Sequence, residues 1–208
     1  EKHDGADLYL CSSSLNYDSV NGNKILIPDP VDINYTKERE KCQTFVHNAG
    51  TLGIGGANGT MELIKALSYA KQPFKMIIRS QVPISCNDPR VDLRIGDFDF
   101  EELFKEGDVF VLPQKFRATS LPIQESMVSG MPVLTSDIKP FNEFVNFTFP
   151  VHKYRDDKLL RPVKVAELDP IEIAKALDLL YNKNIEEESK KAIEFGKSIS
   201  WDTLKDKY

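Results

Sequence analysis

One short segment of the chain combines residue types that could hold an anion and a sugar. A polar loop runs into Pro122, and proline fits the first turn of a helix because its missing N–H costs nothing there. The free N–H groups and the dipole at a helix N-terminus favour an anion such as a phosphate. The N–H groups of Thr119, Ser120 and Leu121 would supply that site, and the Glu125 carboxylate, about one turn later, could accept hydrogen bonds from sugar hydroxyls. A diphosphate with an attached ribose fits this pattern.

The same residues also have a purely structural interpretation. Ser120 would then cap the helix through its side chain, and Glu125 would be a solvated acid of the first turn. The local pattern does not decide between the two interpretations.

The segment must be positioned by the elements on either side of it. Val109–Leu112 is an unbroken apolar run, which is typical of a strand buried on both faces in a parallel sheet. Gly130 ends the helix that begins near Pro122, and Pro132 prevents it from restarting. Val133–Leu134 then begins the next strand.

Strands and helices alternate from Gln43 onward. The other predicted strands are Thr44–Asn48, Phe74–Ile78, Val91–Ile95 and Phe149–His152. The predicted helices are Thr60–Lys71, Asp99–Lys105 (with a capping box from Asp99 to Glu102), Pro170–Tyr181 and Glu186–Ile199, and a charged loop is predicted over Tyr154–Pro162. This alternation predicts an α/β fold with a doubly wound, Rossmann-like, mainly parallel sheet.

The first 42 residues do not contain enough strands for a core of their own. They are predicted to hold two short strands, Ala6–Cys11 and Lys24–Ile27, a loop over Ser12–Asn23 and a helical turn within Thr36–Cys42. We therefore divide the chain into an arm, residues 1–42, and a domain with carboxyl-terminal helices, residues 43–208.

A second loop, Gly50–Gly59 (GTLGIGGANG), also follows a predicted strand. Ligands on doubly wound sheets bind at the carboxyl ends of strands, so this loop and Gln114–Ser120 should share one crevice. The glycines fit either a backbone that approaches a ligand closely or a flexible surface turn. The dinucleotide fingerprint fits poorly, because its spacing differs and Arg79 follows the second strand where an acid is expected. The candidate contacts in the loop are Gly50, Gly55, Gly56 and Asn58.

Composition narrows the function classes. The 208 residues are 41% hydrophobic and 28% charged, with a net charge of −5, so no overall basic field would attract nucleic acid. No apolar run is long enough for an integral membrane segment. The three cysteines follow neither a disulfide framework nor a metal-ligand spacing, which favours a reducing, cytoplasmic location and no metal. His47 stands alone, so no nucleophile–base pair is indicated.

Two segments together carry a family resemblance: FVHNAGTLGIGGANGTMELIKAL and DVFVLPQKFRATSLPIQESMVSGMPVLTSDIKPFNEFV. They resemble the carboxyl-terminal, nucleotide-sugar-binding domain of the group 1 glycosyltransferases, which are retaining enzymes of the GT-B fold. KILIPDPVD, from Lys24 to Asp32, resembles the hinge of that family, and SWDTLKDKY resembles its closing helix. The resemblance therefore covers nearly all of the chain.

The resemblance implies a function and partners. The chain would be the carboxyl-terminal half of a glycosyltransferase that transfers a hexose-type sugar to an acceptor with retention. Its donor would be a nucleotide sugar such as a UDP- or GDP-sugar, with no cofactor and no essential metal. The acceptor would bind largely to an amino-terminal domain that this chain lacks, so residues 1–208 alone should bind donor but transfer little sugar. The family further suggests polysaccharide biosynthesis in the cytoplasm, with a membrane-peripheral full-length protein as an open alternative.

The resemblance also assigns roles to residues. Glu125 would bind the ribose, the Thr119–Leu121 amides would bind the diphosphate, and Arg79 would lie near the base. The family carries a further glutamate for the donor sugar, and Arg117 stands in its place; we assign Arg117 and Glu125 to the catalytic site. The Gly50–Gly59 loop also lacks the arginine and lysine that the family offers to the diphosphate.

These departures leave alternatives open. Arg117 would read either an acidic donor sugar or the diphosphate itself, since a guanidinium suits both, or it would simply point to solvent. The whole domain could be a degenerate, non-catalytic sugar-nucleotide-binding module. An unrelated dinucleotide oxidoreductase is disfavoured by the missing acid after the second strand.

Overall fold

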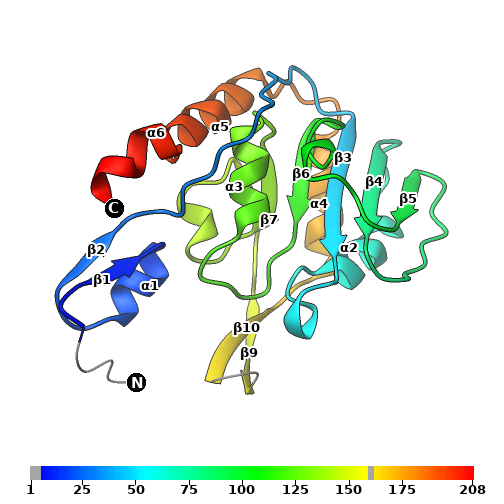
Figure 1. Ribbon diagram of the computed structural model, residues 1–208. Coiled ribbons are helices and arrows are strands. Elements are labelled where there is room, and N and C mark those ends of the chain that lie inside the picture. Colours follow the sequence, from blue (N-terminus) through cyan, green and yellow to red (C-terminus); the bar gives the residue numbers. More distant parts are fainter. Residues whose placement is uncertain (1–5, 159–161) are drawn as a thin grey trace.

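The computed structural model describes residues 6–158 and 162–208, and its centre is a six-stranded sheet (Figure 1). The strands are β3 (Thr44–Gly50), β4 (Lys75–Ser80), β5 (Val91–Ile95), β6 (Val109–Leu112), β7 (Val133–Ser136) and β8 (Phe147–Phe149). Their order in the sheet is β5-β4-β3-β6-β7-β8, and every neighbouring pair is parallel. The prediction of a doubly wound, mainly parallel sheet is confirmed.

Helices cover both faces of the sheet. The longer ones are α2 (Thr60–Leu67), α3 (Leu121–Val128), α4 (Pro170–Leu180) and α5 (Glu186–Ser198). Short ones are η1 (Ile54–Gly56), η2 (Phe100–Glu102), η3 (Phe141–Glu143), α6 (Trp201–Leu204) and η4 (Lys205–Lys207). In Figure 1, α3 lies in front of the sheet and packs against α5, whereas α4 lies behind the sheet and packs against α2. All four residues of β6 are therefore buried, which explains its unbroken apolar sequence.

The predicted helix Asp99–Lys105 is wrong, because only the 3₁₀ turn η2 forms there. The Asp99 side chain makes no capping hydrogen bond. Buried side chains take the carbonyls that a helix would need: Arg79 donates to the Leu103 carbonyl, and Arg39 donates to the Phe104 carbonyl. Tertiary hydrogen bonds thus override the local helix signal.

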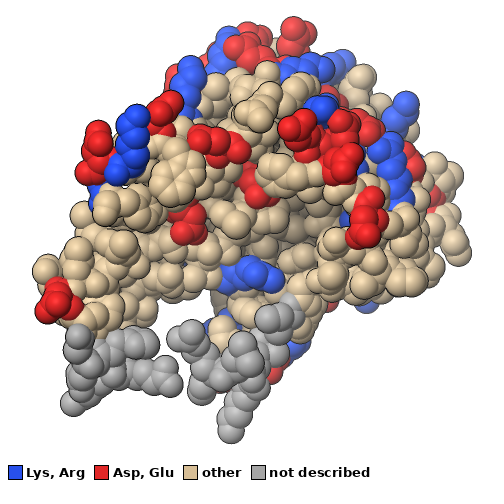
Figure 2. Space-filling view, in the orientation of Figure 1, with Lys and Arg blue, Asp and Glu red and all other residues tan. Residues whose placement is uncertain are grey.

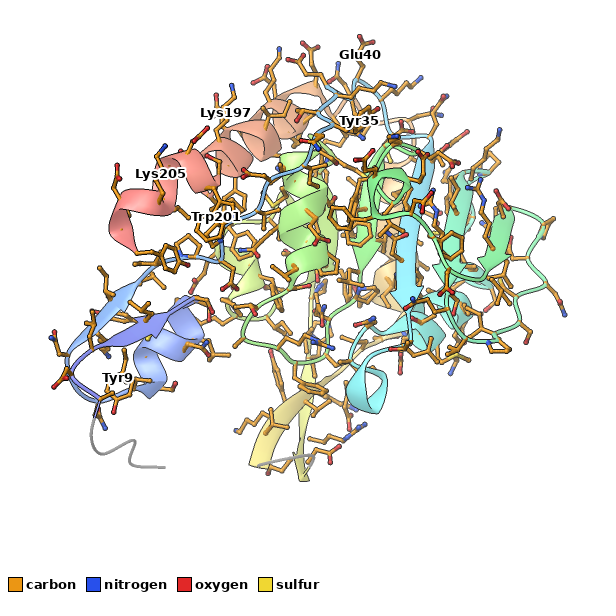
Figure 3. The ribbon with its side chains drawn as sticks, viewed as in Figure 1. Tyr9, Tyr35, Glu40, Lys197, Trp201 and Lys205 are labelled. Atoms are coloured by element: carbon orange, nitrogen blue, oxygen red, sulfur yellow. The ribbon has the colours of Figure 1, made fainter. Side chains whose placement is uncertain are left out.

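The predicted helical turn within Thr36–Cys42 is also wrong, because this linker has no helical residues and pairs with neighbouring segments. Arg39 is only 3% exposed. Its guanidinium donates to four backbone carbonyls, those of Lys37, Phe104, Gly107 and Ser129. In Figure 3 Tyr35 and Glu40 lie at the upper edge of the molecule, so the linker passes over the edge where β3 and β6 begin.

A hairpin replaces the charged loop predicted over Tyr154–Pro162. Strand β9 (Lys153–Lys158) pairs antiparallel with β10 (Pro162–Glu167), and residues 159–161 lie outside the described part of the chain. The final strand of the main sheet, predicted at Phe149–His152, instead ends at Phe149. At the base of the hairpin, the Ala166 N–H donates to the Lys115 carbonyl at 2.9 Å, which ties the hairpin to the loop that follows β6.

The described part of the arm contains β1 (Tyr9–Cys11), α1 (Ser14–Ser19) and β2 (Lys24–Leu26). The two strands pair in parallel with each other alone, in a sheet separate from the main one. The loop predicted over Ser12–Asn23 is wrong, because the Ser13 hydroxyl accepts from the Asn16 N–H and starts α1. The chain end returns to the arm, where the Tyr208 hydroxyl donates to the Pro28 carbonyl at 3.2 Å.

His47 sits where β3 and β6 begin to separate, and the sequence gave no sign of its role. Backbone pairing between these strands is recorded only for Phe45–Val109 and Val46–Phe110. His47, fully buried, lies 2.8 Å through Nδ1 from the Val111 carbonyl and 2.8 Å through Nε2 from Thr60 Oγ1. A carbonyl can only accept, so Nδ1 carries the proton and Nε2 accepts from the threonine hydroxyl. The ring thereby fixes the start of α2 relative to both strands.

We expect the His47→Asn variant to lose stability in a pH-dependent way. Burial lowers the pKa of His47 to about 4 from its ordinary value of 6.5. The unfolded chain therefore binds the proton first, and the contribution of neutral His47 is complete above pH 6.5 and lost as pH falls towards 4. The loss over that window is on the order of 3 kcal/mol. The stability deficit of the variant should shrink correspondingly between pH 7 and 4.5 in urea unfolding experiments.

The exposed His152 offers the matched control. His152→Asn should follow the wild-type pH profile, and an identical profile for His47→Asn would show that the buried ring does not titrate as its surroundings require.

Candidate functional site

Two loops meet at the carboxyl ends of the adjacent central strands β3 and β6. The Lys115 N–H donates to the Ala57 carbonyl at 3.0 Å, which joins the loop after β6 to the glycine loop after β3. The strand order changes direction between β3 and β6, so this is the position where ligands bind on doubly wound sheets. The prediction that both loops share one location is confirmed. In Figure 2 the lower part of this face, where the strands end, is mostly uncharged, with a basic patch beside the central hollow.

The glycine loop has an unusual backbone. All of its glycines have positive φ, and so does Leu52, with φ of 68°, in a region that a side chain makes unfavourable. A side-chain carbon at Gly59 would lie 2.2 Å from the Pro113 carbonyl oxygen, so the two loops can approach this closely only over glycine. The loop is therefore shaped by its contacts rather than being a free surface turn.

The predicted contact residues of the glycine loop fall into two groups. Asn58 donates through Nδ2 to the Ala49 carbonyl at 3.0 Å, and the Gly50 carbonyl accepts from the Gln81 N–H at 2.8 Å, so both brace the loop. Gly55 is exposed, and Gly56 lies beneath the Lys115 ammonium, 3.6 Å from where a side-chain carbon would be.

The N-terminus of α3 presents unpaired amides. Within the described residues, the N–H groups of Thr119, Ser120 and Leu121 donate no hydrogen bond. The structural interpretation of Ser120 is wrong, because its hydroxyl makes no cap and instead accepts from Gln114 Nε2 at 3.2 Å. Pro122 lies in the first turn, as the sequence predicts. Three donors are thus available for an anion.

Three basic side chains lie near these loops, and two of them are already paired. Lys115 Nζ lies 2.8 Å from Glu62 Oε1. Arg79 is 2% exposed and lies 3.3 Å from Glu106. Arg117 is exposed and has no ion pair among the described residues, and its Nη2 would lie 3.1 Å from a side-chain carbon at Gly53. Of these three, Arg117 is the cation that remains available above the glycine loop.

Arg79 is not brought together with the other predicted site residues through any recorded contact. Its guanidinium donates to Asn48 Oδ1 at 3.3 Å and to the Leu103 carbonyl at 3.1 Å, and Glu106 also binds Arg94 at 2.7 Å. Contact with a nucleotide base through this guanidinium would have to break that network.

Glu125 is half-buried and has no recorded side-chain hydrogen bond or ion pair within the described residues. Burial raises the pKa of its carboxyl group to about 7 from its ordinary value of 4.5. A buried acid without a cationic partner is destabilising for the protein alone, and such groups concentrate at functional sites. Ribose hydroxyls would give this carboxylate the donors that the chain does not supply.

Sequence reasoning missed two glutamines in this segment. Gln114 and Gln124 are 1% and 5% exposed, and the Oε1 atom of each is buried without a hydrogen-bond partner. A buried, unpaired carbonyl is unfavourable. The only signal in the sequence was their position on either side of the loop, because polar residues there are also common on exposed turns.

Comparison with known proteins supports the resemblance seen in the sequence. The family model described as glycosyl transferases group 1 matches residues 86–183, which confirms that resemblance for this part of the chain. A search of curated protein sequences finds no match.

Solved structures of glycosyltransferases share the fold. The pneumococcal O-GlcNAc transferase GtfA, determined with UDP and GlcNAc, matches with a TM-score of 0.71 at 12% identity, over 97% of this chain and 44% of that one. Sucrose-phosphate synthase from Thermosynechococcus elongatus matches with a TM-score of 0.66 at 16% identity, over 98% and 57%. WaaG, a glycosyltransferase involved in lipopolysaccharide biosynthesis, gives 0.63 at 12% identity, over 95% and 60%. The fold is the Rossmann-like fold of GT-B enzymes, and the chain spans about half the length of these proteins.

Two searches of the described residues gave no site. No group of three or more His, Cys, Asp or Glu side chains is arranged to hold a metal ion. No helix in the same residues is long and apolar enough to cross a membrane.

We expect Glu125→Gln to change the pH dependence of stability. Between pH 4.5 and 7 the folded protein holds the Glu125 proton while the unfolded chain has lost it, so this group lowers stability as pH rises through that window. The variant, which cannot ionise, should gain on the order of 1 kcal/mol over wild type between pH 5 and 8, a figure reduced because solvent reaches part of the carboxyl. Urea unfolding at several pH values measures this gain.

Glu194→Gln, which removes an exposed acid of α5, should show no such trend. A stability difference between Glu125→Gln and wild type that does not vary with pH would contradict the assignment.

Proposed function

We propose that the two loops and the N-terminus of α3 bind the diphosphate of a nucleotide-sugar donor, such as a UDP- or GDP-sugar, in a glycosyltransferase. The observation that carries the proposal is the convergence of the three unpaired amides of Thr119–Leu121 with an unpaired guanidinium, that of Arg117, at the crossing of the strand order. The group 1 family match and the GT-B structures support sugar-nucleotide transfer as the general activity.

The residues divide the recognition of the donor. The Thr119–Leu121 amides and Arg117 neutralise the diphosphate, and the Gly53–Gly56 backbone lets that group approach closely. The Glu125 carboxylate accepts from the ribose hydroxyls. Arg79 is left out of this assignment, because its guanidinium is held by Glu106.

The reaction that follows needs no nucleophile from these residues. The bond between the anomeric carbon and the phosphate oxygen breaks, and a bond to the acceptor hydroxyl oxygen forms. The proton of that hydroxyl passes to the departing phosphate, and the amides and Arg117 stabilise the charge that develops there. We propose a hexose-type sugar, transfer with retention, and a role in cytoplasmic polysaccharide biosynthesis.

The acceptor site belongs in this proposal to an amino-terminal domain, for which residues 1–42 provide the connection to the donor-binding domain, residues 43–208. Residues 1–208 alone should then bind donor and transfer little sugar. A transfer assay that compares this chain with a longer parent protein tests this expectation, and rapid transfer by the chain alone would contradict it.

A non-catalytic sugar-nucleotide-binding module is the second candidate. The observation that favours it is the pairing of Lys115 with Glu62 and of Arg79 with Glu106, which leaves fewer cations for a leaving diphosphate. Both candidates require nucleotide binding, and only the first requires sugar transfer by the longer protein.

We expect Arg117→Ala to weaken UDP or GDP binding by ten- to a hundredfold, because a hydrogen bond to a charged group contributes roughly 1.5–3 kcal/mol. Isothermal titration calorimetry measures the change, and it should be smaller at high salt because screening weakens the charge–charge part.

Lys65→Ala removes one positive charge from the exposed surface of α2 and serves as the control. It should leave nucleotide affinity unchanged. Unchanged affinity for Arg117→Ala as well would mean that the guanidinium points to solvent.

A further inference from the structure

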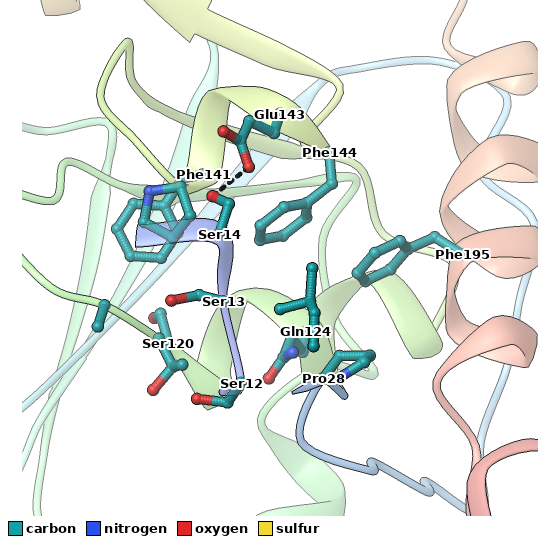
Figure 4. Close-up of a pocket in the computed structure, with 14 residues that line it drawn as sticks. Ser12, Ser13, Ser14, Pro28, Ser120, Gln124, Phe141, Glu143, Phe144 and Phe195 are labelled. Carbon is teal, nitrogen blue, oxygen red and sulfur yellow. Dashed lines mark hydrogen bonds between the residues drawn. The ribbon is translucent and has the colours of Figure 1, made fainter. Parts of the chain in front are cut away.

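A pocket of about 230 Å³ lies between the arm and the N-terminus of α3. The arm contributes Ser12–Ser14, Leu26 and Pro28, and the opposite wall contributes Ala118–Ser120 and Gln124. Figure 4 shows Phe141, Phe144 and Phe195 closing one side. The volume suits one small ring or substituent rather than a whole nucleotide. Thr119 and Ser120 belong both to this pocket and to the proposed diphosphate site, so the pocket is adjacent to the phosphates.

The charges around the pocket favour a neutral occupant. Glu143 is the one charged residue of its lining, and that carboxylate accepts from the Ser14 hydroxyl and lies 3.4 Å from Lys139 Nζ. Arg117 is not part of the lining. An anionic group would meet the Glu143 carboxylate without a facing cation, and a cationic group would have to compete with Lys139.

Gln124 gives the pocket one demanding polar atom. The side chain lines the pocket at 5% exposure, and its Oε1 is buried without a partner. A ligand N–H or O–H would satisfy this acceptor. The remaining wall beside it is largely apolar, with the rings of Phe141 and Phe144, so the same ligand should also carry an apolar group.

We infer that this pocket receives the donor sugar, and that the sugar is a neutral acetamido hexose. Its amide N–H donates to Gln124 Oε1, and its methyl group packs against Phe141 and Phe144. The inference rests on the proposed function, because the neighbouring diphosphate site is what brings a sugar to this pocket. It also assigns Arg117 to the diphosphate rather than to an acidic sugar.

Sugar 1-phosphates test the inference without depending on the base. The amide and side-chain NMR signals of the 208-residue chain are followed during titration with N-acetyl-α-glucosamine 1-phosphate, α-glucose 1-phosphate and α-glucuronate 1-phosphate. The acetamido sugar should bind about tenfold more tightly than glucose, from one hydrogen bond to a buried acceptor and one buried methyl group. The uronate should bind most weakly. Equal affinities, a preference for the uronate, or no binding of any of the three would overturn the inference.

Gln124→Leu should abolish the preference for the acetamido sugar while leaving glucose 1-phosphate affinity nearly unchanged. Gln72→Leu, in an exposed turn after α2, should keep the preference. If Gln124→Leu does not fold, the wild-type titrations still decide. UDP and GDP titrated into the same chain separate the two levels: nucleotide binding without sugar preference overturns this inference alone, whereas absence of nucleotide binding overturns the proposed function and this inference with it.

Discussion

The close approach of two loops at one glycine is the constraint on which the site depends. Gly59 lies against the Pro113 carbonyl with no room for a side-chain carbon, and the Lys115–Ala57 hydrogen bond holds the contact. This contact brings the end of β3 against the end of β6. His47 secures the same junction one layer deeper, inside the sheet. A binding crevice at this position is therefore a product of backbone packing, and the side chains that face a ligand are added to a frame already fixed.

The distribution of positive charge follows from what the fold requires. Arg39 and Arg79 are buried and serve backbone carbonyls or a carboxylate, which are contacts that a neutral side chain could not replace one for one. Lys115 is paired with Glu62 across the loop junction. Arg117 is the exception, and it extends over the glycine loop from the neighbouring loop. Positive charge that the family places on one loop is here supplied by the other.

The sheet and the α3 segment were predictable because their signals are local and strong. The unbroken run of β6, the proline that opens α3 and the glycine that follows it describe one unit, and the structure confirms each part. The failures share one cause, which is that distant contacts decide the local structure. The carbonyls at Leu103 and Phe104 are taken by remote arginines, so the segment after Asp99 does not become a helix. No local pattern could have shown that Gln124 is buried without a partner or that Arg79 is held by Glu106.

The arm touches the rest of the molecule at few points, among them the Ser14–Glu143 hydrogen bond and the Tyr208–Pro28 hydrogen bond. One wall of the pocket moves with the arm, and the other moves with α3. The volume of the pocket is thus a function of the angle between two bodies. A molecule that fits one angle better than another must shift the distribution of angles by the same free energy that it gains in affinity. Substrate selection and the posture of the arm are, in this protein, two measurements of one equilibrium.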